Sequence, residues 1–142
     1  MTNEPVPLHV PAESAGALPY GLGFLAYIPA PFANLIITGI VMAAVYPSQK
    51  RKGTLAAENA RQAANWGLTM IAVMIVMFAL ILVIVPFVNH TSASSAALAP
   101  LILFGATAVA HLIVIITGLV HANRREVFRN PIAIPFFRAV KV

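Results

Sequence analysis

The most constraining feature of the sequence is the distribution of its charged residues. No Asp, Glu, Lys or Arg occurs in residues 14–49 or in residues 62–123. Charged residues make up only 9% of the chain and hydrophobic residues 60%, whereas a typical soluble domain carries about 25% charged residues. A chain of 142 residues cannot bury so much apolar surface in a water-soluble core. The sequence therefore predicts an all-helical (all-α) integral membrane protein.

The two charge-free runs predict three transmembrane helices, because a hydrocarbon core of about 30 Å requires about 20 apolar helical residues. The second run holds two of them, since proline, asparagine and serine replace the aliphatic residues between Pro86 and Ser95. We place the three spans near residues 22–46, 64–88 and 98–121. The expected domains are a polar, Pro-rich outer tail, a three-helix membrane domain and a basic interfacial tail, at residues 1–19, 20–122 and 123–142.

Prolines and glycines make the first span unusual. Pro29 and Pro31 lie within it, and interior prolines remove helix hydrogen bonds and kink the chain. We expect a short helix around residues 18–28, a break, and a straighter helix over residues 31–46. The break could form a hinge or line a cavity, or it could serve only the packing of a kinked helix, which we favour.

The basic residues predict the orientation in the membrane, because they accumulate on the cytoplasmic side. All nine fall in two segments, the loop after the first span and the carboxyl-terminal tail. Three spans place both segments on one side, with the amino terminus outside and the carboxyl terminus in the cytoplasm. The expected location is the bacterial cytoplasmic (inner) membrane. The basic and interfacial side chains expected at the lipid headgroups are Lys50, Arg51, Lys52, Trp66, Arg124, Arg125, Arg129 and Arg138.

Small and polar residues on the spans predict where helices pack together. In membranes such residues collect at helix–helix contacts, whereas large aliphatic residues face lipid. One stripe of the second span combines Gln62, Asn65 and Thr69 with small apolar residues. The residues expected in helix packing or partner contacts are Asn34, Thr38, Arg61, Gln62, Asn65, Thr69, Ala72, Thr107, His111 and Gly118.

His111 is the one titratable residue expected deep in the bilayer, near its midplane. An ionisable residue at such a depth is a candidate functional site, and it could bind haem, relay protons or contact a quinone. Alternatively, it is a neutral imidazole hydrogen-bonded to Thr107, Asn34 or Thr38. Haem usually has a second axial ligand, and no other histidine lies at a matching depth, so we favour the neutral, hydrogen-bonded side chain.

The sequence offers no arrangement typical of catalysis. Its four acidic residues lie outside the predicted spans, so no carboxylate pair can be placed for acid–base chemistry. No metal-binding histidine pair, phosphate-binding loop or nucleophile elbow is visible, and there is no cysteine. We expect neither enzymatic activity, nor a cofactor or metal, nor a small-molecule substrate. Nucleic acid is not an expected partner, because the orientation rule already accounts for the basic residues.

Two short motifs carry a resemblance to a known family. A-E-N-A-R-Q-A-A-N-W at 57–66 leads into the second span, and R-R-E-V-F-R-N-P at 124–131 follows the third. Together with residues 25–46 they resemble the bacterial family of domain of unknown function 4870. That family is distantly related to the Tic-twenty-like channel subunit of the chloroplast import translocon. Asn59 stands where the family usually has histidine, and Arg125 where it usually has glycine.

The resemblance implies a helical membrane fold and no established reaction. It also singles out the entrance of the second span, where we expect Arg61 or Gln62 to contact Glu126 or a backbone carbonyl near Asn130. We interpret the chain as a non-catalytic accessory subunit of a larger integral membrane complex, for which a respiratory complex is one plausible host. The alternative is a homo-oligomeric channel or protein-translocation component of the Tic-twenty-like type.

Overall fold

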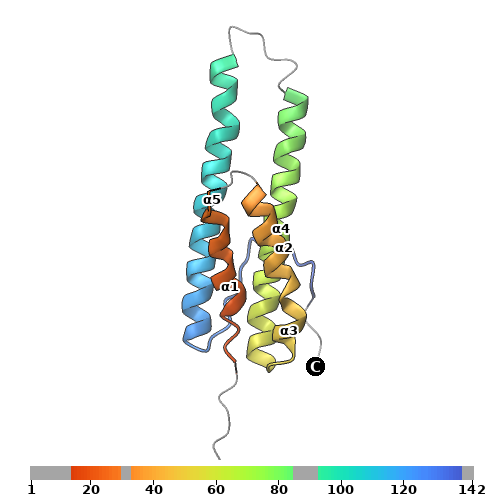
Figure 1. The fold of residues 1–142 in the computed structure, drawn as a ribbon, viewed down its shortest axis with the longest axis vertical. Coiled ribbons are helices and arrows are strands. Elements are labelled where there is room, and N and C mark those ends of the chain that lie inside the picture. The colour runs from red at the N-terminus through yellow and green to blue at the C-terminus, as the bar shows by residue number, and fades with distance from the viewer. Residues whose placement is uncertain (1–13, 30–32, 85–92, 139–142) are drawn as a thin grey trace, which may run out of the picture.

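The computed structural model describes residues 14–29, 33–84 and 93–138, and these residues form helices and irregular segments without a strand. Two long helices stand side by side along the whole molecule, and shorter helices cover one half of their length (Figure 1). The elements in chain order are α1 (Leu18–Leu22), the 3-10 helix η1 (Gly23–Tyr27), α2 (Ala33–Ala44), α3 (Tyr46–Lys50), α4 (Thr54–Ile84) and α5 (Ala93–Asn123).

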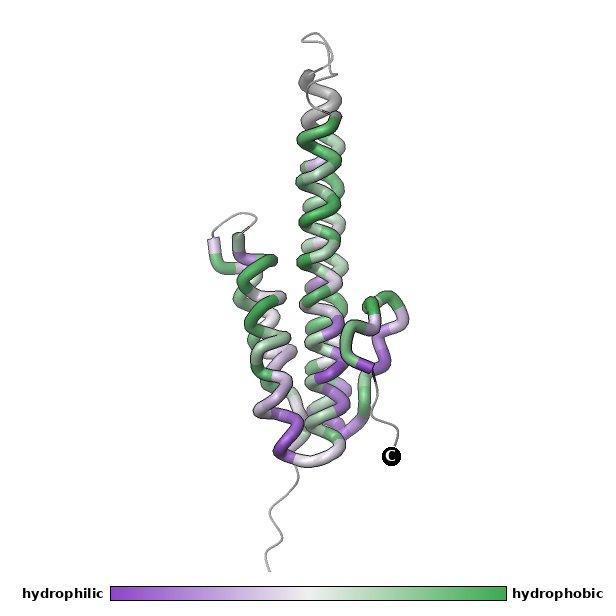
Figure 2. The backbone as a smooth tube through the Cα atoms, turned by 90° about the vertical axis from the view of Figure 1, so that its right-hand side faces the viewer, coloured by the Kyte–Doolittle hydropathy of each residue, from purple (hydrophilic) through white to green (hydrophobic). Residues whose placement is uncertain are grey.

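The two long helices have the length and composition of membrane spans. The segments Thr54–Val83 and Leu98–Asn123 have mean hydropathies of 2.6 and 2.3 in their most apolar windows. Only 33% and 22% of those windows are buried inside the molecule, whereas a core helix of a soluble protein is mostly buried. Figure 2 shows the apolar residues along the upper parts of both helices and the polar residues at the lower end. A membrane-embedded fold follows from this exposed apolar surface.

The predicted first span differs from the structure, in which it is a helical hairpin. The chain rises through α1 and η1, turns back, and descends through α2 to α3 beside the long helices (Figure 1). The 12 residues of α2 reach about 18 Å, whereas the 31 residues of α4 reach about 46 Å. Each arm of the hairpin therefore runs along only part of the long helices, and the segment does not cross from one end of the molecule to the other.

Local chemistry explains where the hairpin turns. Ile28 ends η1 in an extended conformation, with φ −69° and ψ 138°, as the steric demand of a following proline favours. Asn34, in the first turn of α2, donates its side-chain N–H to the carbonyl oxygen of Ile28 and so ties the two arms together. The break near Pro29 was predicted from the sequence, but the reversal of direction was not.

The hairpin begins and ends at the end of the molecule that carries the basic loop. Asn59 near the start of α4 donates to the carbonyl oxygen of Ala15 at 2.9 Å. A Cβ atom on Gly16 would lie 2.8 Å from the backbone of Ala56. Residues 14–17 therefore lie beside the first turns of α4, close to the 50–53 loop, which Figure 1 also shows. We call this end of the molecule the basic end. Residues 14–17 thus lie at the same end of the molecule as the basic loop, whereas the sequence predicted the two on opposite faces of the membrane.

Very close backbone contacts hold the hairpin to the long helices. A Cβ atom on Gly39 in α2 would lie 2.5 Å from the carbonyl oxygen of Gly67 in α4, so the two helices touch at their backbones. Gly118 in α5 lies under the ring of Tyr20 in α1, where a Cβ atom would come within 2.2 Å of that ring. The main core cluster consists of Tyr20, Met42, Ala63, Trp66, Met70, Val114, Ile115 and Ala122.

The long helices agree with the sequence at α4 and differ in detail at α5. α4 contains the predicted span from residue 64 onward and begins earlier, at Thr54. The end of the predicted span near residue 88 lies outside the described residues. α5 begins at Ala93, so the predicted polar turn does not extend to Ser95. The packing stripe on α4 is covered only in its lower part, because Asn65 and Thr69 are buried whereas Val76 is exposed.

The end of α5 redirects the chain upward along α4. The N–H of Glu126 donates to the carbonyl oxygen of His121, and the N–H of Arg125 donates to that of Ala122. These bonds form a Schellman motif, which requires a left-handed residue directly after the helix. Arg125 adopts this conformation, with φ 61°. The chain beyond it climbs back beside α4, as Figure 2 shows, and we call residues 131–138 the strap.

Candidate functional site

His111 lies at the centre of a hydrogen-bonded group that joins α5, α4 and the hairpin. The indole Nε1–H of Trp66 donates to His111 Nδ1 at 3.0 Å. His111 Nε2 lies 3.0 Å from the carbonyl oxygen of Gly23. Since an indole N–H can only donate and a carbonyl can only accept, Nδ1 is the acceptor and Nε2 carries the proton. The imidazole is therefore neutral and uses both of its nitrogen atoms.

The imidazole ring of His111 is enclosed by other side chains. Its relative exposure is 1%, and the rings of Trp66 and Tyr27 lie with their centroids 6.3 Å and 6.1 Å away. The hydroxyl of Tyr27 donates to the carbonyl oxygen of Ala108 at 2.6 Å and holds η1 against α5. The predicted partners Thr107, Asn34 and Thr38 are not those found in the structure. The arrangement supports a structural imidazole and offers no nitrogen to a haem iron.

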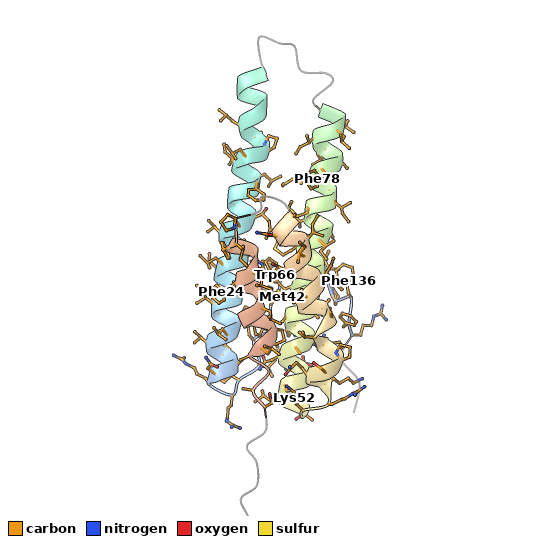
Figure 3. The ribbon with its side chains drawn as sticks, in the orientation of Figure 1. Phe24, Met42, Lys52, Trp66, Phe78 and Phe136 are labelled. Atoms are coloured by element: carbon orange, nitrogen blue, oxygen red, sulfur yellow. The ribbon has the colours of Figure 1, made fainter. Side chains whose placement is uncertain are left out.

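Trp66 and His111 were predicted at different depths in the membrane, and the structure differs from that prediction. The sequence predicts Trp66 at the headgroups and His111 near the midplane, yet a 3.0 Å hydrogen bond places both side chains at one depth. Trp66 is buried with Met42 in the core cluster, and Figure 3 shows both inside the bundle. Trp66 is therefore a core side chain and is not exposed as a residue at the lipid headgroups would be. The only tryptophan of the chain is used here for its N–H donor and its bulk.

A second group of polar side chains lies on α4 at the basic end. The side chain of Asn59 is fully buried and joins three segments of the chain. Its Nδ2 donates to the carbonyl oxygens of Ala15 at 2.9 Å and Glu126 at 3.0 Å. Its Oδ1 accepts the N–H of Phe128 at 3.2 Å. Asn59 thus fixes the start of the hairpin and the end of α5 to α4.

The same side of α4 holds the strap. Asn65 accepts the N–H of Phe137 at 2.7 Å and donates to its carbonyl oxygen at 3.1 Å. Thr69 Oγ1 accepts the N–H of Ile134 at 2.8 Å. These side chains replace the backbone partners that an irregular segment lacks. We call Asn59, Asn65 and Thr69 the polar clamp.

Arg61 completes the attachment of the strap. It donates from one guanidinium nitrogen to the carbonyl oxygen of Phe137 at 2.8 Å and pairs with Glu58 through the others, at 2.9 and 2.5 Å. The expected contact between the entrance of α4 and the tail is present, but the partner differs. The backbone carbonyl lies at Phe137 instead of near Asn130, and the carbonyl of Glu126 is bound by Asn59. Gln62 reaches only Glu58, at 3.5 Å.

The basic side chains predicted at the membrane surface are exposed at the basic end. This holds for Lys50, Arg51 and Lys52 around the end of α3 and for the arginines after α5; Figure 3 shows Lys52 at this end. A shallow cavity of about 550 Å³ opens between α3 and α4. It is lined by Tyr46, Lys50, Arg51, Gly53, Thr54, Ala57, Glu58 and Arg61.

The other residues predicted in helix packing lie at separate places along the bundle. Thr38 is fully buried on α2, and its hydroxyl has no hydrogen-bond partner among the described residues. Thr107 bonds the carbonyl oxygen of Leu103 within its own helix, at 2.8 Å. Ala72 is half-buried on α4. Gly118 and Asn34 hold the hairpin at the contacts with Tyr20 and Ile28 given above.

Three residues that matter in this site were not predicted from the sequence. Asn59 was set aside as a departure from a family motif, although an asparagine in an alanine-rich helix entrance is itself a signal of a buried hydrogen bond. Gly39 and Gly67 were not singled out, although small residues on neighbouring helices indicate close approach. No such signal pointed to the partners of these residues, because they are distant in the sequence.

The described residues contain no group of three His, Asp or Glu side chains that could hold a metal ion. Glu58 pairs with Arg61, and His111 is bonded through both nitrogens. His121 bonds the carbonyl oxygen of Thr117 one turn earlier in α5, at 2.9 Å. The polar groups of the described core therefore hold segments of the chain together.

Comparison with known proteins identifies the family. A family model described as the magnetosome magnetite crystal formation protein family, MamF/MmsF, matches residues 17–137. The curated proteins and the solved structures that were searched gave no match. The resemblance to domain of unknown function 4870 and to the Tic-twenty-like group was wrong, and the motifs that carried it are short. Because the match covers most of its length, the chain belongs to the magnetosome magnetite crystal formation protein family.

Proposed function

We propose that the protein is a non-catalytic component of the magnetosome membrane that supports the formation of magnetite crystals. The observation that carries this proposal is the family match over residues 17–137, combined with two long helices whose apolar surface is largely exposed. A protein of this kind would act at the membrane beside the growing crystal, through binding contacts and without catalysing a reaction.

The distribution of charge supports an orientation in that membrane. The basic end, with Lys50–Lys52 and the arginines after α5, faces the cytoplasm by the positive-inside rule. The opposite ends of α4 and α5 then face the interior of the magnetosome. The amino-terminal residues 14–17 belong to the cytoplasmic side, since they are bonded to the basic end.

The use of the polar side chains supports a role without catalysis. General acid–base chemistry needs a titratable group that can reach a substrate. His111 is enclosed and bonded through both nitrogens, and Glu58 is paired with Arg61. The amides of Asn59 and Asn65 bind the backbone of the same chain.

An accessory role beside other membrane proteins is the finer part of this proposal. Large apolar side chains on the upper halves of α4 and α5, such as Leu82 and Ile102, remain exposed and are available to lipid or to other helices. A respiratory host has no place in it, because the family is one of magnetite crystal formation. Purification from magnetosome membranes in mild detergent should recover other integral membrane proteins in stoichiometric amounts. Recovery of this chain alone would contradict the accessory role.

Complementation of a deletion strain tests the function itself. In a magnetosome-forming bacterium that lacks this chain, electron microscopy should show altered numbers or sizes of magnetite crystals. Expression of the intact chain should restore them. Normal crystals in the deletion strain would contradict the proposal.

Amide variants in the same strain test the absence of catalysis. Glu58→Gln, Glu126→Gln and His111→Gln each remove a titratable group and keep hydrogen-bonding capacity. All three should restore crystals as well as the intact chain does, with membrane levels checked by immunoblotting. A variant that reaches normal levels but forms no crystals would indicate a chemical role for that group.

A further inference from the structure

We propose that the strap, residues 131–138, is set into the lipid leaflet at the basic end, where its outward side chains contact acyl chains and the arginines beside it bind lipid phosphates. The proposal rests on the membrane location given under the proposed function and goes beyond it, because it assigns a lipid-binding element to a segment without regular secondary structure. Its partner is a phospholipid leaflet that contains anionic lipid.

The outward face of the strap is apolar. Ile132, Ile134 and Phe136 have relative exposures of 61%, 47% and 49%, and Figure 3 shows Phe136 on the outer side of the molecule. Two neighbouring residues turn inward: Ala133 packs against the core cluster, and the ring centroid of Phe137 lies 4.9 Å from that of Tyr46. Three large apolar side chains thus point away from the protein on alternate residues. Such a surface is unfavourable in water and favourable in lipid.

The depth of the strap along α4 matches that of lipid. Thr69, which binds Ile134, lies 15 residues after Thr54 in one continuous helix, or about 22 Å along its axis. The polar headgroup layer is only about 5–8 Å thick on each side of the hydrocarbon core. If the start of α4 lies at the outer edge of that layer, the strap therefore reaches the acyl chains.

Neighbouring side chains at the same level are also apolar and exposed. Gly67 lies between the strap partners Asn65 and Thr69, and its backbone touches Gly39 of α2. Ile37 and Ile40, on either side of Gly39, point outward from a helix that has no charged residue. The exposed surface of α2 at this level is therefore suited to lipid, and the strap continues it on another side of the bundle.

Lipid requires that the polar groups of an irregular segment find partners within the protein, and part of the backbone of the strap does so. Pro131 and Pro135 have no N–H to satisfy. The donor groups of the strap that are hydrogen-bonded are Ile132 N–H to Asn130 Oδ1, Ile134 N–H to Thr69 Oγ1, Phe136 N–H to Ile134 O and Phe137 N–H to Asn65 Oδ1. The polar clamp thus satisfies two of the strap's N–H groups within the protein and lowers the cost of moving this segment out of water.

Positive charge lies at both ends of the strap. Arg129 precedes it and Arg138 closes it, and both side chains are exposed. Basic residues near an anionic membrane surface are attracted to its headgroups. Two arginines beside three apolar side chains favour a leaflet with anionic headgroups over a purely apolar protein surface.

Site-directed spin labelling tests this placement in the whole protein. The chain has no native cysteine, so Ile134→Cys and Phe136→Cys each give one labelling position. The purified variants are reconstituted into vesicles of phosphatidylethanolamine and phosphatidylglycerol, and collisions with oxygen and with a water-soluble nickel chelate are measured. Leu82→Cys on the exposed face of α4 serves as the lipid reference and Lys52→Cys as the water reference. Ala133→Cys, which faces inward, is the matched control within the strap.

The strap labels should behave like the label at position 82, with collisions by oxygen exceeding those by nickel several-fold. The label at position 133 should be poorly accessible to both reagents. Labels at 134 and 136 that collide with nickel as often as the label at 52 would overturn the proposal. The same result would be expected if a partner protein, absent from the vesicles, covered the strap in cells. The label at 82 would still report lipid in that case, so the membrane location itself would stand.

Discussion

The role of His111 is ambiguous in the sequence and is defined by its contacts in the structure. From the sequence it is a titratable group at membrane depth, and several roles fit. In the structure it accepts from Trp66 and bonds the Gly23 carbonyl, so one side chain links α4, α5 and the hairpin. Its chemistry matters because both bonds lie in a buried place where an unmade hydrogen bond is costly.

Two replacements of His111 test whether its two hydrogen bonds, and not its ability to carry a charge, stabilise the protein. His111→Gln offers a carbonyl oxygen and an N–H, so its free energy of unfolding in detergent should stay close to that of the unmodified protein. His111→Leu leaves the Trp66 indole and the Gly23 carbonyl without partners and should cost about 1–2 kcal/mol. Titration with a denaturing detergent, followed by circular dichroism, measures both. Equal stability of the two variants would mean that the hydrogen bonds contribute nothing. Separately, a Soret band in the absorption spectrum of the purified protein would indicate bound haem and would contradict the neutral, enclosed imidazole.

Two glycines of α5 form a matched pair for the packing of the hairpin. A Cβ atom on Gly118 would lie 2.2 Å from the Tyr20 ring, whereas one on Gly105 would meet nothing within 4 Å. Gly118→Ala should therefore destabilise the protein by about 1–3 kcal/mol through overpacking. Gly105→Ala should cost nothing measurable in the same detergent titration. A loss of stability in Gly105→Ala as large as that in Gly118→Ala would contradict the contact between Tyr20 and Gly118.

Arg125 carries a conformational cost that the sequence already suggests. It stands in the left-handed region at φ 61°, where a side chain costs about 1–2 kcal/mol and glycine costs nothing comparable. Arg125→Gly should thus stabilise the protein by about 1 kcal/mol in a thermal melt. Arg124→Gly, one residue earlier and without positive φ, is the control and should not stabilise it. A decrease in stability of the Arg125 variant would indicate that its side chain contributes more than its backbone costs.

At the scale of elements, α4 organises the rest of the chain. Its lower half provides the polar clamp for the strap and the glycine contact for α2, and its upper half is exposed and apolar. The composition of α4 and α5 allowed both to be predicted from the sequence, although α4 begins at Thr54, before the predicted span. The strap was predicted only as an interfacial tail, because its hydrogen bonds join residues more than 60 positions apart, which local patterns do not reveal.

Loss of the polar clamp should release the strap. Asn65→Ala removes the two bonds to Phe137, so trypsin should cleave after Arg138 faster than in the unmodified protein, by about tenfold if the two bonds together contribute about 1.4 kcal/mol. Asn123→Ala, an exposed amide at the end of α5, is the matched control. Mass spectrometry of the digestion products gives the rates. Equal cleavage of the two variants would show that Asn65 does not hold the strap.

At the scale of the whole molecule, the sequence predicted a helical membrane protein but not its path. The expected break at the prolines is present, yet a hairpin and a kinked span share the same hydropathy pattern. What distinguishes them is the contact of residues 15 and 16 with Ala56 and Asn59, which depends on the folded arrangement. The basic residues predict on which side of the membrane their own segments lie. The amino-terminal tail has no basic residue, so the sequence does not predict its side in the same way.

The side of the membrane reached by residue 14 tests this account most directly. Ser14→Cys, Lys52→Cys and Ser94→Cys each introduce a single thiol into a chain without cysteine. In sealed vesicles with the cytoplasmic face outward, an impermeant maleimide should label positions 14 and 52 directly and position 94 only after detergent is added. Labelling of position 14 together with position 94, and not with position 52, would contradict the hairpin and restore a first segment that crosses the membrane.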